Sequence, residues 1–121
     1  WADRLAALEP ADLLVAVSQA PYTVQTVQAV QQAAACGVPV LALTDSALSP
    51  LARAATQSLL FDAASPAFFH SMTGAQALAE TLMQAVAEQG GEAVVQRLAQ
   101  RQKQLQTARV YWDKPGPLGR L

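Results

Sequence analysis

The feature that most constrains this sequence is the recurrence of short apolar runs, each separated from the next by polar turn residues and a helix-type pattern. The runs lie at 13–17, 38–43 and 58–61. Runs of this length, bounded by turn residues, are typical of strands that are buried on both faces of a parallel sheet. Their alternation with helical segments predicts an α/β fold, a three-layer α/β/α arrangement around a parallel sheet. Three strands are few for such a sheet, so we expect its first strand to be missing from the chain.

Capping signals bound the helical segments of the first two thirds of the chain. A stripe of apolar residues within 24–34 predicts a helix, which ends at Cys36 and Gly37 because glycine readily adopts the left-handed cap conformation. Ser49 with Pro50, and Ser65 with Pro66, each combine an N-cap serine with a proline at the first helical position. They predict a short helix up to about residue 56 and a long helix that starts near residue 66.

The last third of the sequence predicts two helices that complete one domain, followed by a tail without regular structure. Gly90 and Gly91 interrupt the long helix, and a last helix is expected over about 92–111. The segment 113–121 contains two prolines and two glycines, so it cannot continue that helix. We therefore expect one domain over 1–112 and an irregular C-terminal tail over 113–121.

Composition narrows the classes of function. Only 14% of residues are charged and the net charge is −1, so this segment is not expected to grip nucleic acid by itself. No apolar run approaches the roughly 20 residues of a membrane span. The only cysteine, Cys36, fits a core position in a cytoplasmic protein. Together with the only histidine, His70, it does not make a metal-ligand set, so neither metal nor cofactor is expected.

Hydroxyl-rich turns follow the first two predicted strands, at 18–23 and at 44–46 with Ser49. Ligands of open α/β sheets bind at the carboxyl ends of the strands. The first turn leads into a helix, whose free N–H groups favour an anion such as phosphate. The same residue types also form caps and turns where no ligand binds, and the pattern alone leaves both interpretations open.

Three segments taken together carry a family resemblance: 13–23 followed by a helix, GVPVLALTDS at 37–46, and SPLA at 49–52. This combination resembles the SIS (sugar isomerase) domain family. The stretch FFHSMT at 68–73 is similar to the start of the long helix in RpiR-like transcriptional regulators, and the resemblance covers about 12–111. It implies an SIS-like domain that senses a phosphorylated sugar or related small anion. The low charge fraction, the long helix and an apolar seam that ends at Trp112 predict in addition a homodimer, because apolar helix faces need cover. DNA would be bound only through an N-terminal helix-turn-helix domain that this chain does not contain.

The resemblance also assigns site residues. In SIS domains the first turn usually reads Ser-x-Ser-Gly-x-Thr and wraps the sugar phosphate. The ligand-binding residues implied for this chain are Ser18, Gln19, Thr23 and Ser46. Thr23 stands where the first strand gives way to the helix, so we expect its hydroxyl both to cap the helix and to contact the anion. Ala20 replaces the second serine and Pro21 replaces the glycine, which removes one hydroxyl and one backbone N–H. These two replacements predict a weakened phosphate cradle.

The candidate acid–base residues His70 and Glu80 argue against catalysis, although two functions other than sensing stay open. A histidine such as His70 does acid–base work in some sugar isomerases, yet here we expect a partly buried or interface residue. Glu80 lies ten residues further on, about 15 Å along a helix, so no acid–base pair forms and no catalytic residue is assigned. One alternative is a sugar-phosphate isomerase-type enzyme. The other is a degenerate SIS domain that serves only dimerisation, which Ala20 and Pro21 favour.

Overall fold

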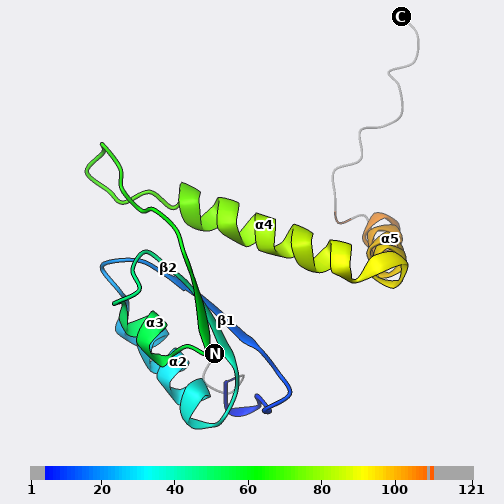
Figure 1. The fold of residues 1–121 in the computed structure, drawn as a ribbon. Coiled ribbons are helices and arrows are strands. Elements are labelled where there is room, and N and C mark those ends of the chain that lie inside the picture. Colours follow the sequence, from blue (N-terminus) through cyan, green and yellow to red (C-terminus); the bar gives the residue numbers. More distant parts are fainter. Residues whose placement is uncertain (1–4, 109, 111–121) are drawn as a thin grey trace, which may run out of the picture. The chain divides into compact units, whose positions relative to one another are not determined.

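The computed structural model describes residues 5–108 and Val110. These form two compact units, and the boundary along the chain lies between Thr81 and Leu82. The first unit holds a parallel sheet with its helices (Figure 1). Its elements, in chain order, are β1 (Leu14–Ser18), α2 (Val24–Ala35), β2 (Val40–Thr44), α3 (Pro50–Ala54) and β3 (Gln57–Leu60). The predicted α/β class and parallel sheet are confirmed.

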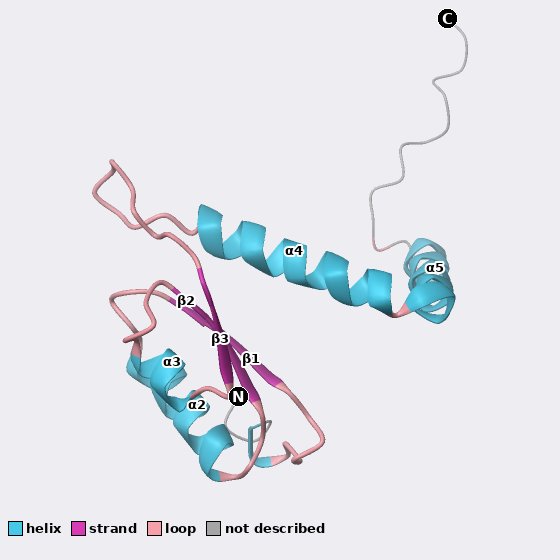
Figure 2. Ribbon diagram, in the orientation of Figure 1, coloured by secondary structure: helices cyan, strands magenta, loops and turns pink. Residues whose placement is uncertain are grey.

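The sheet has the order β1-β2-β3, and both pairings are parallel. Figure 2 draws its strands in magenta. Leu14 lies opposite Val40, and Ser18 lies opposite Thr44. The two strands therefore end at the same level, and the turns that follow them leave the same edge of the sheet. This register positions the candidate site.

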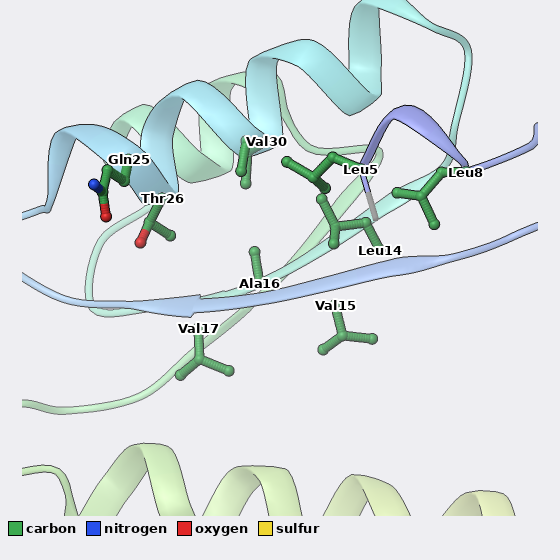
Figure 3. Close-up of a pocket in the computed structure, with 10 residues that line it drawn as sticks. Leu5, Leu8, Leu14, Val15, Ala16, Val17, Gln25, Thr26 and Val30 are labelled. Carbon is green, nitrogen blue, oxygen red and sulfur yellow. The ribbon is translucent and has the colours of Figure 1, made fainter. Parts of the chain in front are cut away.

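One core cluster of the first unit lies between the sheet and helices α2 and α3. Side chains alternate along a strand, so Leu14 and Ala16 of β1 face α2 while Val15 and Val17 point to the opposite face (Figure 3). The core cluster comprises Ala16, Val30, Ala33, Val38, Val40, Ala42 and Leu51. Full burial of an aliphatic side chain stabilises a fold by about 1.5–3 kcal/mol, so this small cluster supplies much of the stability of the unit.

Two of the predicted helix boundaries are confirmed in detail. Gly37 follows α2 with φ 76°, the left-handed conformation that glycine adopts without strain. Ser49 is the N-cap of α3, and its hydroxyl accepts the Ala52 N–H at 3.0 Å, with Pro50 as the first helical residue. Cys36, in contrast, is exposed at the C-cap of α2, so its predicted core position is wrong.

The prediction that the long helix starts near residue 66 is wrong, because α4 spans Thr73–Gln89. The Ser65 hydroxyl accepts the Ala67 N–H in a local turn instead of capping a helix. The Ser71 N–H donates to the Ala63 carbonyl at 3.1 Å, which holds the intervening segment as a loop. His70 lies in this loop and is exposed, so it is not partly buried, and its predicted place in an interface stays a prediction.

Gly91, with φ 58°, opens helix α5 (Gly91–Thr107), as the glycine pair predicts. Helix α5 ends at Thr107, before the predicted end near residue 111, and the tail 113–121 lies outside the described residues. The prediction of one domain over 1–112 stays a prediction. Among residues 5–108, no helix combines the length and apolar character that a membrane crossing requires.

Two leucines three residues apart give a matched test of the core. Leu51 is fully buried in the core cluster, whereas Leu48 is 75% exposed. We expect Leu51→Ala to lower the free energy of unfolding by about 2–5 kcal/mol, because it removes buried methyl groups and leaves a cavity. Leu48→Ala should change it by less than about 0.5 kcal/mol. Urea unfolding of both variants checks this, and equal losses would contradict the core assignment.

Candidate functional site

The candidate site lies where β1 and β2 end side by side. Ser18 closes β1 and lies opposite Thr44, the last residue of β2. The turn 19–23 leads from β1 to the start of α2 and contains a cis peptide bond between Ala20 and Pro21. The turn 45–49 leads from β2 to α3. The strand register thus brings two polar turns to one edge.

The side chain of Asp45 connects these two turns. Its Oδ2 accepts the backbone N–H of Ala20 at 3.2 Å, and its Oδ1 accepts the Tyr22 hydroxyl at 2.7 Å. The hydroxyl of Thr44, a fully buried residue, also donates to Oδ1 at 3.3 Å. Two donors from the first turn and one from the last residue of β2 therefore converge on one carboxylate, which holds the first turn against the end of β2.

These hydrogen bonds set the protonation states of Asp45 and Tyr22. Desolvation by burial acts to raise the pKa of Asp45, but the hydrogen bonds from Tyr22 and from the Ala20 N–H outweigh it, and the pKa lies below its ordinary value. Desolvation raises the pKa of Tyr22, and the hydrogen bond to Asp45 and its negative charge raise it further. At neutral pH, Asp45 is therefore an acceptor carboxylate and Tyr22 a protonated donor.

All four residues assigned from the sequence lie at this edge. Ser18 is half-buried at the end of β1, and Ser46 is half-buried with its hydroxyl accepting the Leu48 N–H at 3.1 Å. The Oε1 atom of Gln19 is buried and has no hydrogen-bond partner among the described residues. Thr23 is the N-cap residue of α2 and is exposed. The edge therefore offers hydroxyl groups and one unpaired amide oxygen.

The predicted capping role of the Thr23 hydroxyl is wrong. Thr23 has the extended backbone of an N-cap, but its side chain makes no cap hydrogen bond. Its Oγ1 lies 2.7 Å from Oγ1 of Thr26, one turn along the helix. The two hydroxyls hydrogen-bond each other because residues i and i+3 are neighbours on a helix surface. The Thr23 hydroxyl thus lies at the N-terminus of α2 without accepting a hydrogen bond from its backbone N–H groups.

The sequence reasoning missed the two residues that organise the site, Asp45 and Tyr22. Each followed a strand in the printed sequence, but their pairing depends on the register of β1 against β2. The available signal was that carboxyl ends of neighbouring parallel strands meet at one edge, so an acid after one strand can reach donors after the other.

A groove of about 530 Å³ lies elsewhere, along β1 and α2 (Figure 3). Leu5, Leu8 and Leu14 form part of its apolar wall, and Gln25 and Thr26 are the polar residues of its lining within the part of the chain that the structure describes. It contains none of the residues 18–23. The hydroxyl of its lining residue Thr26 lies 2.7 Å from the Thr23 hydroxyl, so the groove adjoins the start of α2 at the polar edge.

Substitution of Tyr22 tests the connection to Asp45. Tyr22→Phe removes the 2.7 Å hydrogen bond and keeps the ring, so we expect a loss of about 1 kcal/mol in the free energy of unfolding at pH 7. The pKa of Asp45 is lowered on folding, so its hydrogen bonds stabilise the fold above the unfolded value of about 3.9 and are lost as pH falls through the folded pKa. The difference between parent and variant should therefore shrink below about pH 4.

Urea unfolding across the acid range measures this difference. Asp45→Asn serves as the control, since the Tyr22→Phe substitution should cost less in that background than in the parent. A difference between Tyr22→Phe and the parent that stays constant from pH 7 to pH 3 would contradict the assigned contact.

The chain is similar to known proteins in sequence and in structure. A sequence profile of the SIS domain family matches residues 1–87. The RpiR transcription factor of Sphaerobacter thermophilus (sugar isomerase domain) superposes with a TM-score of 0.78 and 34% identity, over 84% of this chain and 57% of that one. Vibrio vulnificus NanR, whose structure contains ManNAc-6P, superposes with a TM-score of 0.75 and 23% identity, over 91% of this chain and 43% of that one.

The chain thus spans 57% and 43% of the lengths of these two structures. No curated protein sequence shows significant similarity to it. The family match covers well over half of the chain, and it includes β1, β2 and both turns of the polar edge. This chain belongs to the SIS domain family.

Proposed function

We propose that this chain is the effector-sensing domain of an RpiR-like transcriptional regulator. Its ligand is a phosphorylated sugar or a related small anion, bound at the turns after β1 and β2. The observation that carries the proposal is the strand register, which sets Ser18 opposite Thr44 and so gathers the polar turns beside the N-terminus of α2. Hydroxyl groups and the unpaired N–H groups of a helix N-terminus suit an anion that carries several acceptor oxygens.

The individual groups support this ligand class. The N-terminus of α2 has no side-chain cap hydrogen bond, so its first N–H groups are not taken by Thr23. The hydroxyls of Ser18, Thr23 and Ser46 add donors without adding charge. Gln19 adds an amide whose Oε1 has no partner among the described residues and can accept a hydroxyl of a sugar.

The related structures support the same proposal. The 34% identity to an RpiR transcription factor supports a role in a regulator. NanR shares the fold and contains an amino-sugar phosphate, the same ligand class. We further propose that the protein is cytoplasmic and that DNA is contacted through a separate helix-turn-helix domain.

A second candidate is an SIS domain that only dimerises. Ala20 lacks a hydroxyl, Pro21 lacks an N–H, and the Ala20 N–H donates to Asp45. All three observations reduce the donors that the first turn can offer a phosphate. Binding experiments with phosphosugars distinguish the two candidates.

The sensor role predicts selective thermal stabilisation. A panel of hexose 6-phosphates should contain at least one compound that raises the melting temperature, and its unphosphorylated counterpart should raise it less. Thr23→Ala should lower the affinity for that compound by about tenfold or more, because it removes a hydroxyl that would donate to the charged phosphate. Thr23→Ser keeps the hydroxyl and serves as the matched control. Equal affinity for Thr23→Ala and the parent, or no stabilisation by any phosphosugar, would contradict the sensor role.

We also propose a homodimer in solution. The adjacent Phe68 and Phe69 are 93% and 76% exposed, and their rings pack edge to face at 5.0 Å between centroids. Exposed aromatic pairs of this kind favour a protein–protein contact. The loop that carries them is hydrogen-bonded between Ser71 and Ala63, which presents the pair on an ordered segment.

Sedimentation velocity at micromolar concentration should show a dimer. Phe68→Ala should shift it toward monomer, because truncating an exposed aromatic anchor removes apolar contact area. Leu48→Ala, which removes a 75% exposed apolar side chain elsewhere, should leave the dimer unchanged. A parent chain that sediments only as monomer would contradict the proposal.

A further inference from the structure

We propose that Asp45 lowers the anion affinity of the polar edge, as an internal competitor that an anionic ligand must displace from the Ala20 N–H and the Tyr22 hydroxyl. This inference rests on the proposed function, since it concerns the same ligand and the same edge. It adds a residue and a mechanism that the family pattern of hydroxyls and backbone donors does not contain.

The first argument is the occupation of donors. The Ala20 N–H lies in the turn that would wrap a phosphate, and it donates to Oδ2 of Asp45 at 3.2 Å. The neighbouring Pro21 has no N–H, and the Tyr22 hydroxyl donates to Oδ1 of Asp45 at 2.7 Å. A carboxylate and a phosphate are both anionic acceptors, and one N–H group donates strongly to only one of them. Asp45 therefore occupies the donors at the centre of the turn.

The second argument is charge. The chain carries neither lysine nor arginine between Arg4 and Arg53, a stretch that contains β1, α2 and β2. The charged side chains within that stretch are Glu9, Asp12 and Asp45. Glu9 and Asp12 precede β1 and so lie at the amino end of the strand, away from the polar edge. Of these acids, Asp45 alone lies at the carboxyl end of the strands, where an incoming anion meets its negative charge.

The third argument is that Asp45 is firmly held where it stands. Tyr22, Ala20 and Thr44 all donate to its carboxylate, and Tyr22 is the titratable side chain that faces it from the first turn. Displacement by a phosphate breaks these contacts and frees the Ala20 N–H and the Tyr22 hydroxyl to donate to the ligand. Anion affinity at this edge is accordingly lower than the hydroxyl pattern alone implies.

The test compares phosphate binding by the full chain and by Asp45→Asn. Inorganic phosphate is titrated at pH 7 and constant ionic strength while the amide signal of Ala20 is followed by NMR. Asp45→Asn keeps the size of the side chain and removes the charge, so phosphate should bind about tenfold tighter, which corresponds to about 1.4 kcal/mol. Asp12→Asn is the matched control: it makes the same charge change where Asp12 accepts the Glu9 N–H at 2.9 Å, and it should leave phosphate affinity as in the parent.

A second measurement uses the parent chain and does not depend on the folding of a variant. The Ala20 amide shift should follow the protonation of Asp45 in the acid range, because the two groups are hydrogen-bonded. An Ala20 amide that is insensitive to this titration would overturn the proposal, as would equal phosphate affinity of the parent and Asp45→Asn. Weaker binding to Asp45→Asn would also overturn it, since Asp45 would then act as a ligand acceptor or structural support.

These results separate the inference from the proposed function. Phosphosugar binding by the parent, without a phosphate gain in Asp45→Asn, rejects the competitor role and retains the sensor. A phosphate gain in Asp45→Asn, with no phosphosugar bound by the parent, retains the competitor role and rejects the sensor.

Discussion

The parallel pairing of β1 with β2 is the constraint on which the candidate site depends. With Leu14 opposite Val40 and Ser18 opposite Thr44, both strands end at one edge. A shift of one residue would move every side chain of β1 to the other face, so Val15 and Val17 would replace Leu14 and Ala16 against α2. The apolar core thus fixes the register, and the register in turn brings the Ala20 N–H and Asp45 within hydrogen-bond distance.

The same dependence explains which parts of the molecule the sequence predicted. Local signals succeeded where one short segment decides the outcome: Ser49 caps α3 through the Ala52 N–H, and Gly37 takes a positive φ after α2. Ser65 with Pro66 carries the same signal as Ser49 with Pro50 but forms a turn. There, the backbone N–H of Ser71 donates to the Ala63 carbonyl and closes a loop, and the sequence around Ser65 contains no signal for that contact.

The site residues show the same difference between local signals, which the sequence reveals, and long-range contacts, which it does not. The sequence placed Ser18, Gln19, Thr23 and Ser46 at the strand ends, and the structure finds them there. It assigned the Thr23 hydroxyl to the helix cap, whereas Thr26 takes that hydroxyl. It missed the contact of Tyr22 with Asp45, because the two residues are 23 positions apart and meet only through the sheet. Long-range pairing sets what a polar side chain contacts, and composition or capping rules do not contain that information.

Charge then determines what kind of recognition this edge supports. A helix N-terminus carries roughly half a positive charge, whereas Asp45 carries a full negative one. With neither lysine nor arginine between Arg4 and Arg53, the residues from β1 through β2 provide no cation to reverse this balance. These residues therefore supply no long-range attraction for an anion, and the hydrogen bonds of the edge must supply the affinity that they contribute. Such bonds are effective only when donors stand within a few tenths of an ångström of the right place. Recognition at this edge is therefore governed by the placement of hydroxyl and N–H groups, and that placement is again set by the register of β1 against β2.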